Sequence, residues 1–457
     1  MIQALVDAGM DVARINRSHG EPEEHAKVIK NVRAAAQASG RSVAVLVDLQ
    51  GPKIRLGRFV EGKHDLAVGD TFTITTDDVE GTKERVSTTF KGLPGDVKPG
   101  DPILIDDGKV LVRVLEVNGN DVVTRVEVAG AVSNNKGLNL PGVAVSVPAM
   151  SDKDEADLRW GLAQGADFIA LSFVRNAADY DRVRQIMEEE GRVVPVIAKV
   201  EKPQAVENLA EIVQAFDGIM VARGDLGVEL PLEQVPLVQK RAVELARRNA
   251  KPVIVATQVL ESMTTNPRPT RAEASDCANA VLDGADAVML SGETSVGDYP
   301  IETVRTMARI IEATEQLGRE RIAPLGSTPH TRGGAITRAA AEVGERIGVK
   351  YLVTFTQSGD SARRMSRLRS PIPLLAFTPV ESVRNVLSLS WGVQTYQVPQ
   401  VASTDEMVDQ VDKTLQAHGL AENGDYVVVV SGAPVGVVGS TNSIVVHKIG
   451  DESDRVA

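Results

Sequence analysis

The octapeptide VIAKVEKP (residues 196–203) begins as an apolar, strand-like run and ends with three charged side chains, Lys199, Glu201 and Lys202. Charge is costly to bury, so a strand that ends this way is expected to place its charged groups where a ligand can meet them. The same pattern, an apolar run that ends in polar residues, recurs in three stretches further along the chain, FDGIMVARGD, KPVIVATQ and ADAVMLSGE. The sequence therefore predicts a series of buried strands that each end in polar side chains.

Amphipathic helical segments separate these strands. Their polar ends, Glu201, Asp225, Thr257 and Ser291, follow one another at intervals of 24, 32 and 34 residues, each about the length of one βα unit. Such alternation predicts parallel strands joined by helical crossovers. Three stretches closer to the N-terminus have the same form, DVARINRSH, SVAVLVDLQ and ADFIALSFV, which makes seven predicted strands.

Seven βα strands are one short of a closed eight-stranded TIM barrel. Met1 lies in what reads as the helix before DVARINRSH, so we expect an α/β barrel whose first strand is absent from this sequence. In such a barrel the C-terminal ends of the strands form the active-site face. The predicted catalytic domain covers 1–56 and 148–325, and its charged strand ends predict a catalytic site.

Changes in the pattern of apolar and polar residues predict two further domains. Between DLQGPKIRLG and PGVAVSVPAMSDKD, short alternating β runs replace the βα pattern, and Asp107-Gly108 and Asn118-Gly119 lie where hairpin turns require positive φ. This predicts an inserted β-barrel domain over 57–147. After the linker RERIAPLGSTPHTRGG the βα pattern resumes, which predicts a smaller C-terminal α/β domain over 330–457.

Composition narrows the classes of function. The 457-residue chain is 43% hydrophobic with a net charge of −12, which disfavours nonspecific binding to the nucleic-acid backbone. No uncharged apolar run approaches the roughly 18 to 20 residues of a membrane span, and no signal peptide is recognisable, so we expect a cytoplasmic globular protein. Cys277 is the single cysteine and the six histidines lack zinc-site spacing, so any metal is expected to be held by oxygen.

The predicted strand ends gather a set of polar residues on the active-site face. Glu201 and Asp225, from adjacent strands, offer hard carboxylate oxygens that suit Mg²⁺ or Mn²⁺ while leaving coordination positions open. Arg14 and Lys199 would place fixed cations beside that ion, an arrangement suited to a phosphoryl group. The set also includes Asn16, Ser18, Asp48, Arg223, Gly224, Thr257, Ser291 and Glu293.

Long motifs along the whole chain resemble those of the pyruvate kinase family. The motifs are MDVARINRSHG, DLQGPKIRLG, NNKGLNLPG, IAKVEKPQAVENL, MVARGDLGVELP, ATQVLESM and PTRAEASDCANAVLDGADAVMLSGETSVGDYP. The resemblance implies transfer of a phosphoryl group from phosphoenolpyruvate to ADP, giving ATP and an enolate that is protonated to pyruvate. It also implies a glycolytic homotetramer in which the inserted β domain closes as a lid over the barrel.

The resemblance further implies roles for individual residues. Arg14 would clamp the transferring phosphoryl group, Lys199 would stabilise its charge and the enolate oxygen, and Glu201 and Asp225 would ligate Mg²⁺. The amides of Gly224 and Asp225 would hold the substrate carboxylate together with Thr257, which would lie on the proton-delivery route. Asn16, Arg55 and Lys136 would meet the nucleotide phosphates, and a second Mg²⁺ would arrive with ADP.

One departure from the family pattern concerns potassium. Many members bind K⁺ near the positions of Asn16, Ser18, Asp48 and the residue that follows, which here is Leu49, without a side-chain oxygen. Lys53 stands where those members carry glutamate. Because a tethered ammonium can supply the same positive charge in a poorly solvated site, K⁺ is predicted to be dispensable.

The stretch YLVTFTQSGDSARRMSRLRS in the C-terminal domain reads as a strand, a Ser/Gly turn and a helix. Thr356, Ser358, Gly359 and Ser361 are expected to cradle a phosphate at the turn. In the family this turn is an allosteric effector pocket, so the resemblance implies a phosphorylated effector, either a sugar phosphate or a nucleotide.

Two other functions remain open from the sequence. The Glu201 and Asp225 pair would also suit a Mg²⁺-dependent lyase or aldolase on a related barrel, although the lid domain and Lys136 favour the kinase. A catalytically impaired, truncated relative is the other alternative, since the family normally carries a strand and a Gly-Pro loop before Met1; a miscalled start codon would explain the same feature.

Overall fold

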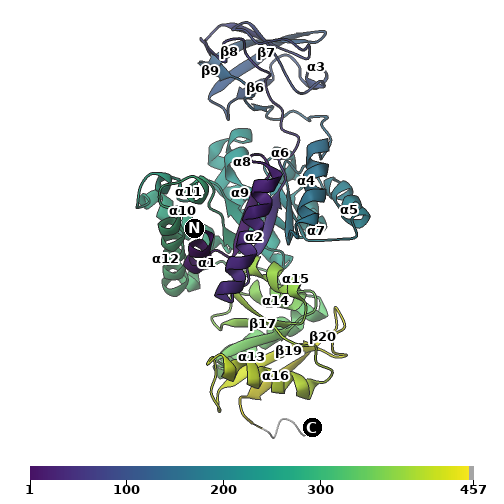
Figure 1. Ribbon diagram of the computed structural model, residues 1–457, viewed down its shortest axis with the longest axis vertical. Helices are drawn as coiled ribbons and strands as arrows, with labels where there is room; N and C mark the ends of the chain where they lie inside the picture. The colour runs from purple at the N-terminus through teal and green to yellow at the C-terminus, as the bar shows by residue number, and fades with distance from the viewer. Residues whose placement is uncertain (452–457) are drawn as a thin grey trace.

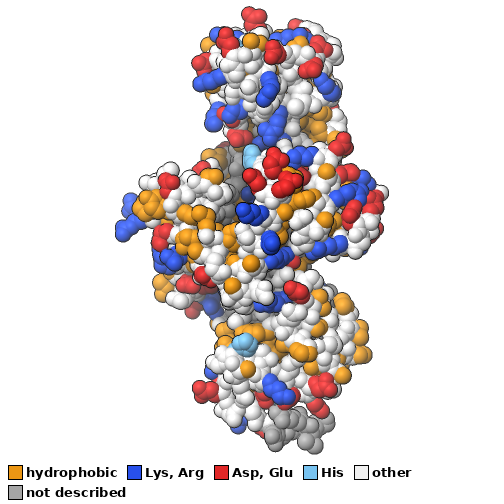
Figure 2. All heavy atoms as spheres, in the orientation of Figure 1, with side chains coloured by type: hydrophobic (Ala, Val, Ile, Leu, Met, Phe, Trp, Pro, Cys, Tyr) orange, Lys and Arg blue, Asp and Glu red, His pale blue; other side chains and the backbone are white. Residues whose placement is uncertain are grey.

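The computed structural model describes residues 1–451, which form three lobes (Figure 1). An α/β barrel lies in the middle, a β domain stands at one end and an α/β domain at the other. Among these residues, no helix combines the length and apolar character that a membrane crossing requires. On the face drawn in Figure 2, acidic and basic side chains are interspersed over all three lobes.

All seven predicted barrel strands are present in one parallel sheet. In spatial order they are β1 (Val12–Asn16), β2 (Ala44–Asp48), β11 (Phe168–Leu171), β12 (Val196–Val200), β13 (Gly218–Ala222), β14 (Val253–Ala256) and β15 (Ala287–Val288). Within residues 1–451, β1 and β15 are the outer strands of this sheet. Helix α1 (Ile2–Ala8) contacts both α2 (Pro22–Ser39) and α12 (Pro300–Gly318), so the layer of helices continues across the side where the sheet is open.

Both faces of the barrel sheet are buried, which explains why its strands read as continuous apolar runs. In β2, Val45 and Val47 pack outward against the helices, while Ala44 and Leu46 point into the barrel. Leu389, from the C-terminal domain, belongs to the same interior cluster as Ala44 and Leu46. The C-terminal domain therefore contributes to the core of the barrel.

The remaining barrel helices connect the strands and cover the sheet. They are α4 (Asp152–Ala163), α5 (Asp179–Glu189), α6 (Pro203–Glu207), α7 (Leu209–Ala215), α8 (Arg223–Glu229), α9 (Val235–Arg248), α10 (Arg271–Asp283) and α11 (Gly292–Ser295), with 3₁₀ turns at Leu232–Gln234, Glu261–Thr264 and Arg319–Arg321. Ser151 caps α4 in a capping box with Asp154, and Thr270 caps α10 with Glu273. Cys277 is buried in α10, and burial raises the pKa of its thiol to about 12.

The β domain encloses its own hydrophobic core between a six-stranded and a two-stranded sheet. Its elements are β3 (Lys63–Leu66), β4 (Thr71–Thr75), β5 (Arg85–Ser87), α3 (Leu93–Asp96), β6 (Pro102–Ile105), β7 (Val110–Asn118), β8 (Asp121–Val128), β9 (Gly130–Ser133) and β10 (Leu138–Asn139). Asp107, Gly108 and Gly119 have the positive φ predicted for hairpin turns. The expectation for Asn118 is wrong, because Asn118 ends β7 in register with Asp121, leaving Gly119 and Asn120 as the turn.

The C-terminal domain is a five-stranded sheet flanked by helices. The strands lie in the order β18 (Val393–Gln397), β17 (Leu374–Thr378), β16 (Tyr351–Phe355), β19 (Tyr426–Gly432) and β20 (Thr441–Lys448), and only β20 is antiparallel to its neighbour. The helices are α13 (Arg332–Ile347), α14 (Asp360–Ser366), α15 (Glu381–Val386), a 3₁₀ turn at Leu387–Leu389 and α16 (Thr404–Ala417). This domain lies at the opposite end of the barrel from the β domain (Figure 1).

Candidate active site

The C-terminal ends of the barrel strands bring the predicted acidic and basic residues together. Arg14 lies on β1, and Asp48 ends β2. Lys199 lies on β12, and Glu201 is the first residue after that strand. The parallel register pairs Arg14 with Leu46 and Asn16 with Asp48, so the polar ends of β1 and β2 reach the same edge of the sheet. This is the edge that faces the β domain (Figure 1).

A chain of buried ion pairs joins these side chains. Arg14 Nε donates to Asp48 Oδ2 at 2.7 Å, and Lys199 Nζ lies 3.4 Å from Asp48 Oδ1 and 2.9 Å from Glu201 Oε1. The side chains of Asp48 and Glu201 are each only 1% exposed. Two cations and two carboxylates therefore compensate one another, which offsets the cost of burying Asp48, Lys199 and Glu201.

These neighbours shift the pKa values of the buried groups. Burial alone would lower the pKa of Lys199, but the negative charges of Asp48 and Glu201 outweigh it, so the pKa of Lys199 is raised. Burial raises the pKa of Glu201, and the charge of Asp225 adds to this rise while Lys199 opposes it. Lys199 therefore stays charged as an ammonium. The raised pKa of Glu201 indicates that Lys199 alone does not fully compensate this buried carboxylate.

The donor set fits a hard divalent cation. Asp48 Oδ1 and Glu201 Oε1 are buried carboxylate oxygens whose shared ion-pair partner is the single ammonium of Lys199. Residues 1–451 contain no cluster of three or more His, Cys, Asp or Glu side chains arranged for a metal. Glu201 with Asp225 would therefore leave several coordination positions for a substrate and water, as Mg²⁺ prefers.

Strained backbone at two strand ends shapes the site. Phe173 follows β11 with φ of 56° and Thr257 follows β14 with φ of 69°, values that are uncommon for residues other than glycine. Phe173 N donates to Glu201 Oε2 at 2.7 Å, and Gly224 N donates to Thr257 Oγ1 at 2.8 Å. Phe173 is thus bonded to Glu201, a predicted metal ligand, and Thr257 to Gly224, a predicted substrate-binding residue.

Two residues of this site were missed by sequence reasoning. Ser172 Oγ accepts a hydrogen bond from Lys199 Nζ at 2.9 Å and donates one to Leu49 O at 2.7 Å. Phe173 contributes its backbone N–H. The available signal is the hydroxyl of Ser172 at the end of ADFIALSFV, a predicted strand that ends in a polar side chain as the other strands of the series do.

Three predicted polar residues turn to structural partners instead. Arg223 pairs with Asp276 at 2.7 Å and donates to Thr257 O at 2.7 Å. Ser291 N donates to Glu293 Oε2 at 2.7 Å, which closes the turn at the start of α11. These contacts fix the loops after β13 and β15 and leave the centre of the site to Lys199, Glu201 and their neighbours.

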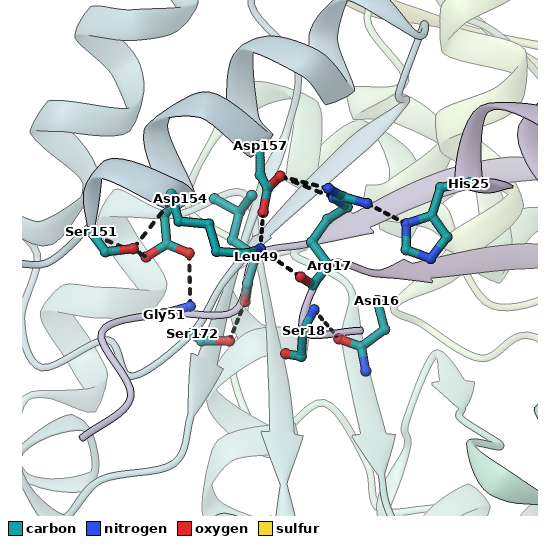
Figure 3. Close-up of polar contacts among 11 residues, drawn as sticks. Asn16, Arg17, Ser18, His25, Leu49, Gly51, Ser151, Asp154, Asp157 and Ser172 are labelled. Atoms are coloured by element: carbon teal, nitrogen blue, oxygen red, sulfur yellow. Dashed lines mark hydrogen bonds and ion pairs between the residues drawn. The ribbon is translucent and has the colours of Figure 1, made fainter. Parts of the chain in front are cut away.

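Asn16 and Ser18 lie in a turn supported by a second layer of polar contacts (Figure 3). Asn16 Oδ1 accepts from Ser18 N at 3.1 Å, and Arg17 between them pairs with Asp157 at 2.9 Å. Lys53 is not part of this group. It is half-buried near the β domain, where a Cβ on Gly137 would lie 2.9 Å from Lys53 Cε, and no ion pair of its side chain is found within the described residues.

The predicted nucleotide residues of the β domain lie at its base. Arg55 Nη1 donates to Asn135 O at 3.0 Å, and Lys136 Nζ pairs with Asp106 Oδ1 at 3.0 Å. A cavity of about 370 Å³ lies below, between the barrel and the β domain. Its lining includes Lys53, Asn139, Phe173, Lys202 and Asp225.

The predicted effector residues lie in the loop between β16 and α14 and, for Ser361, in the first turn of α14. Thr356, Ser358 and Ser361 line a small cavity of about 50 Å³, whose other wall includes the segment 435–441. Gly359 has a φ of 81°, and its N–H donates to Thr356 Oγ1 at 2.8 Å. Ser361 Oγ lies 2.7 Å from Thr441 Oγ1, so the loop is bonded to the strand that closes the cavity.

Comparisons with known proteins agree over nearly the whole chain. The family model "Pyruvate kinase, barrel domain" matches residues 1–304, and "Pyruvate kinase, alpha/beta domain" matches residues 334–447. The pyruvate kinase of Corynebacterium glutamicum is 58% identical over 456 residues, which cover 100% of this chain and 95% of that protein. That of Mycobacterium tuberculosis is 58% identical over 452 residues, covering 99% and 96%.

More distant relatives agree as well. The pyruvate kinase of Geobacillus stearothermophilus is 45% identical over 453 residues, which cover 98% of this chain and 77% of that protein. A crystal structure of a pyruvate kinase from Cryptosporidium parvum superimposes with a TM-score of 0.92 at 36% identity, covering 98% of this chain and 92% of that one. The chain belongs to the pyruvate kinase family.

Proposed function

We propose that this chain transfers the phosphoryl group of phosphoenolpyruvate to ADP, giving pyruvate and ATP, as a cytoplasmic enzyme of glycolysis. The observation that carries the proposal is the buried cluster of Arg14, Asp48, Lys199 and Glu201 at the face of the barrel below the β domain. Fixed cations beside metal-binding carboxylates are what a transferring phosphoryl group requires. Membership of the family supports the same reaction over a lyase or aldolase.

Glu201 and Asp225 would hold Mg²⁺, or Mn²⁺ in its place. The bound ion would supply positive charge to the phosphoryl and enolate oxygens. Within residues 1–451, Glu201 Oε1 is paired only with Lys199, so it would share its charge between that ammonium and the metal.

The side chains around the metal ligands then have separate tasks. Arg14 would clamp the phosphoryl group, and the permanently charged Lys199 would stabilise the charge that develops on it and on the enolate oxygen. The amides of Gly224 and Asp225 would hold the substrate carboxylate, for which Gly224 N would exchange its present acceptor, Thr257 Oγ1. Thr257, whose hydroxyl also donates to Ala256 O, would lie on the route of the proton that converts the enolate to pyruvate.

ADP would be bound between the barrel and the β domain. Asn16 would approach its phosphates from the barrel, and Arg55 and Lys136 from the base of the β domain, with a second Mg²⁺ carried by the nucleotide. Lys136 would exchange its present partner, Asp106, for a phosphate. Closure of the β domain as a lid would exclude water, so that ADP accepts the phosphoryl group.

Lys53 would replace the monovalent cation that many family members bind near Asn16, Ser18 and Asp48. Its ammonium has no carboxylate partner within the described residues and lies at the junction between the barrel and the β domain. Movement of the β domain would carry it towards the site. K⁺ would then be dispensable.

Thr356, Ser358, Gly359 and Ser361 would bind a phosphorylated effector. Their cavity of about 50 Å³ is large enough for little more than the phosphate itself, so the segment 435–441 would have to move for a sugar phosphate or nucleotide to enter. Assembly as a homotetramer would let that movement reach neighbouring subunits.

The first prediction concerns the reaction and its cation requirement. We expect this chain to form pyruvate from phosphoenolpyruvate and ADP with Mg²⁺ in potassium-free buffer, measured by a coupled assay, with no turnover when ADP is omitted. Activity without ADP would favour a lyase. A rise of tenfold or more when K⁺ replaces a large inert cation would contradict the role of Lys53.

The second prediction concerns Lys199. Lys199→Met is expected to lower kcat by about 10² to 10³-fold with little change in the KM for phosphoenolpyruvate, because a preorganised charge acts mainly on the transition state. Lys27→Met, at an exposed lysine of α2, is the matched control and should leave both constants unchanged. Turnover near the parental value in Lys199→Met would remove Lys199 from its proposed role.

The third prediction concerns the effector cavity. A phosphorylated metabolite is expected to lower the half-saturating concentration of phosphoenolpyruvate, and Ser358→Glu should abolish the effect by repelling the phosphate. The control is Ser327→Glu, at an exposed serine between the barrel and the C-terminal domain. A panel of sugar monophosphates, sugar bisphosphates and nucleoside monophosphates would be tested; if Ser358→Glu preserves every effect, the cavity is wrongly assigned.

A further inference from the structure

A buried carboxylate outside the predicted site connects the β domain to the barrel. Glu229, the last residue of α8, has a side chain that is only 1% exposed. Its Oε1 accepts hydrogen bonds from Asn139 Nδ2 at 2.8 Å and from Lys202 Nζ at 2.6 Å. Asn139 is the last residue of β10, where the chain leaves the β domain and returns to the barrel.

The partners of Glu229 lie next to both predicted metal ligands. Lys202 directly follows Glu201 in the chain, and Asp225 lies one turn before Glu229 on the same helix. Lys202 Nζ also lies 5.4 Å from the centre of the Phe173 ring, beside the backbone N–H that holds Glu201. Glu229 Oε1 thus bonds both Asn139, where the chain returns from the β domain, and Lys202, next to Glu201. Glu229 itself lies on the helix that carries Asp225.

The same linker has a second anchor further along. Arg175 Nη1 donates to Val145 O at 3.0 Å and to Val147 O at 2.9 Å, so the linker is bonded to the barrel from Asn139 onward. Asn139 itself pairs with Leu104 in the six-stranded sheet of the β domain, so its bond to Glu229 joins that sheet directly to the barrel. The part of the linker that can turn therefore lies between Asn139 and Val145, and Glu229 holds its β-domain end.

We propose that Glu229 is a positioning residue that couples movement of the β domain to metal binding. It holds the last strand of the β domain to the barrel through Asn139, and it compensates the buried ammonium of Lys202 beside Glu201. Without Glu229, Lys202 would remain as an unpaired cation next to the metal ligands and would oppose a divalent cation. This inference rests on the proposed roles of Glu201 and Asp225.

The test uses Glu229→Gln, which keeps the shape and an acceptor for Asn139 but removes the charge, and Asn139→Ala, which removes only the contact to the linker. Glu233→Gln is the matched control at an exposed glutamate of the next turn. Mn²⁺ affinity is measured by electron paramagnetic resonance of the substrate-free full chain. Movement of the β domain is measured as the distance between spin labels on Val68→Cys and Val193→Cys, both exposed positions, while the buried Cys277 stays unlabelled.

Each variant has its own expected result. Glu229→Gln should raise the Mn²⁺ dissociation constant and the Mg²⁺ concentration that half-closes the β domain with phosphoenolpyruvate, both by about fivefold or more. Asn139→Ala should alter the distance distribution without metal while leaving Mn²⁺ affinity close to the parental value. Parental values in Glu229→Gln, or a parental distance distribution in Asn139→Ala, would overturn the coupling.

Two additional variants keep the test decisive. If Glu229→Gln does not fold, Glu229→Leu combined with Lys202→Met removes both charges. This double variant should retain near-parental Mn²⁺ affinity with an altered distance distribution between the spin labels. A parental distance distribution would overturn the proposal. Glu201→Gln separates this inference from the proposed metal site. Parental Mn²⁺ affinity in Glu201→Gln would overturn the metal site itself, and the coupling with it.

Discussion

One carboxylate, Asp48, is shared by two cations at the edge of the barrel, and the arrangement of the site depends on this sharing. Its two oxygens face Arg14 and Lys199, and Lys199 in turn faces Glu201. Because buried charges are stable only when paired, these four residues have to occur together, and the parallel register that brings strand ends to one edge is what makes this possible. Asp48 Oδ1 and Glu201 Oε1 both share the single ammonium of Lys199, so a divalent cation would add positive charge where two buried carboxylates meet one lysine.

Much of this arrangement was predictable because it follows from periodicity. Apolar runs at βα spacing predicted the seven strands, and polar residues at their ends predicted Arg14, Asp48, Lys199 and Glu201 as neighbours. Ser172 and Phe173 were missed for physical reasons. A serine in an apolar run looks like an ordinary small core residue, and Phe173 acts through a backbone N–H at positive φ, which no pattern of side chains reveals.

Contacts between segments far apart in the chain could not be predicted from the sequence either. Glu229 and Asn139 are 90 residues apart, and a glutamate at the end of a short helix reads as a solvated side chain until the fold buries it. The same holds for Leu389, which enters the interior of the barrel from another domain. Lys53 shows the converse, because its charge was evident in the sequence whereas its place beside Gly137 was not.

A crystal structure with Mn²⁺ and oxalate, an unreactive analogue of the enolate of pyruvate, would locate the metal by anomalous scattering from the manganese. We expect an anomalous peak within coordination distance of Glu201 Oε1 and an Asp225 carboxylate oxygen, with the oxalate facing Lys199. A peak bound elsewhere, or a site in which Glu201 still faces only Lys199, would contradict the assignment of Glu201 and Asp225 as metal ligands.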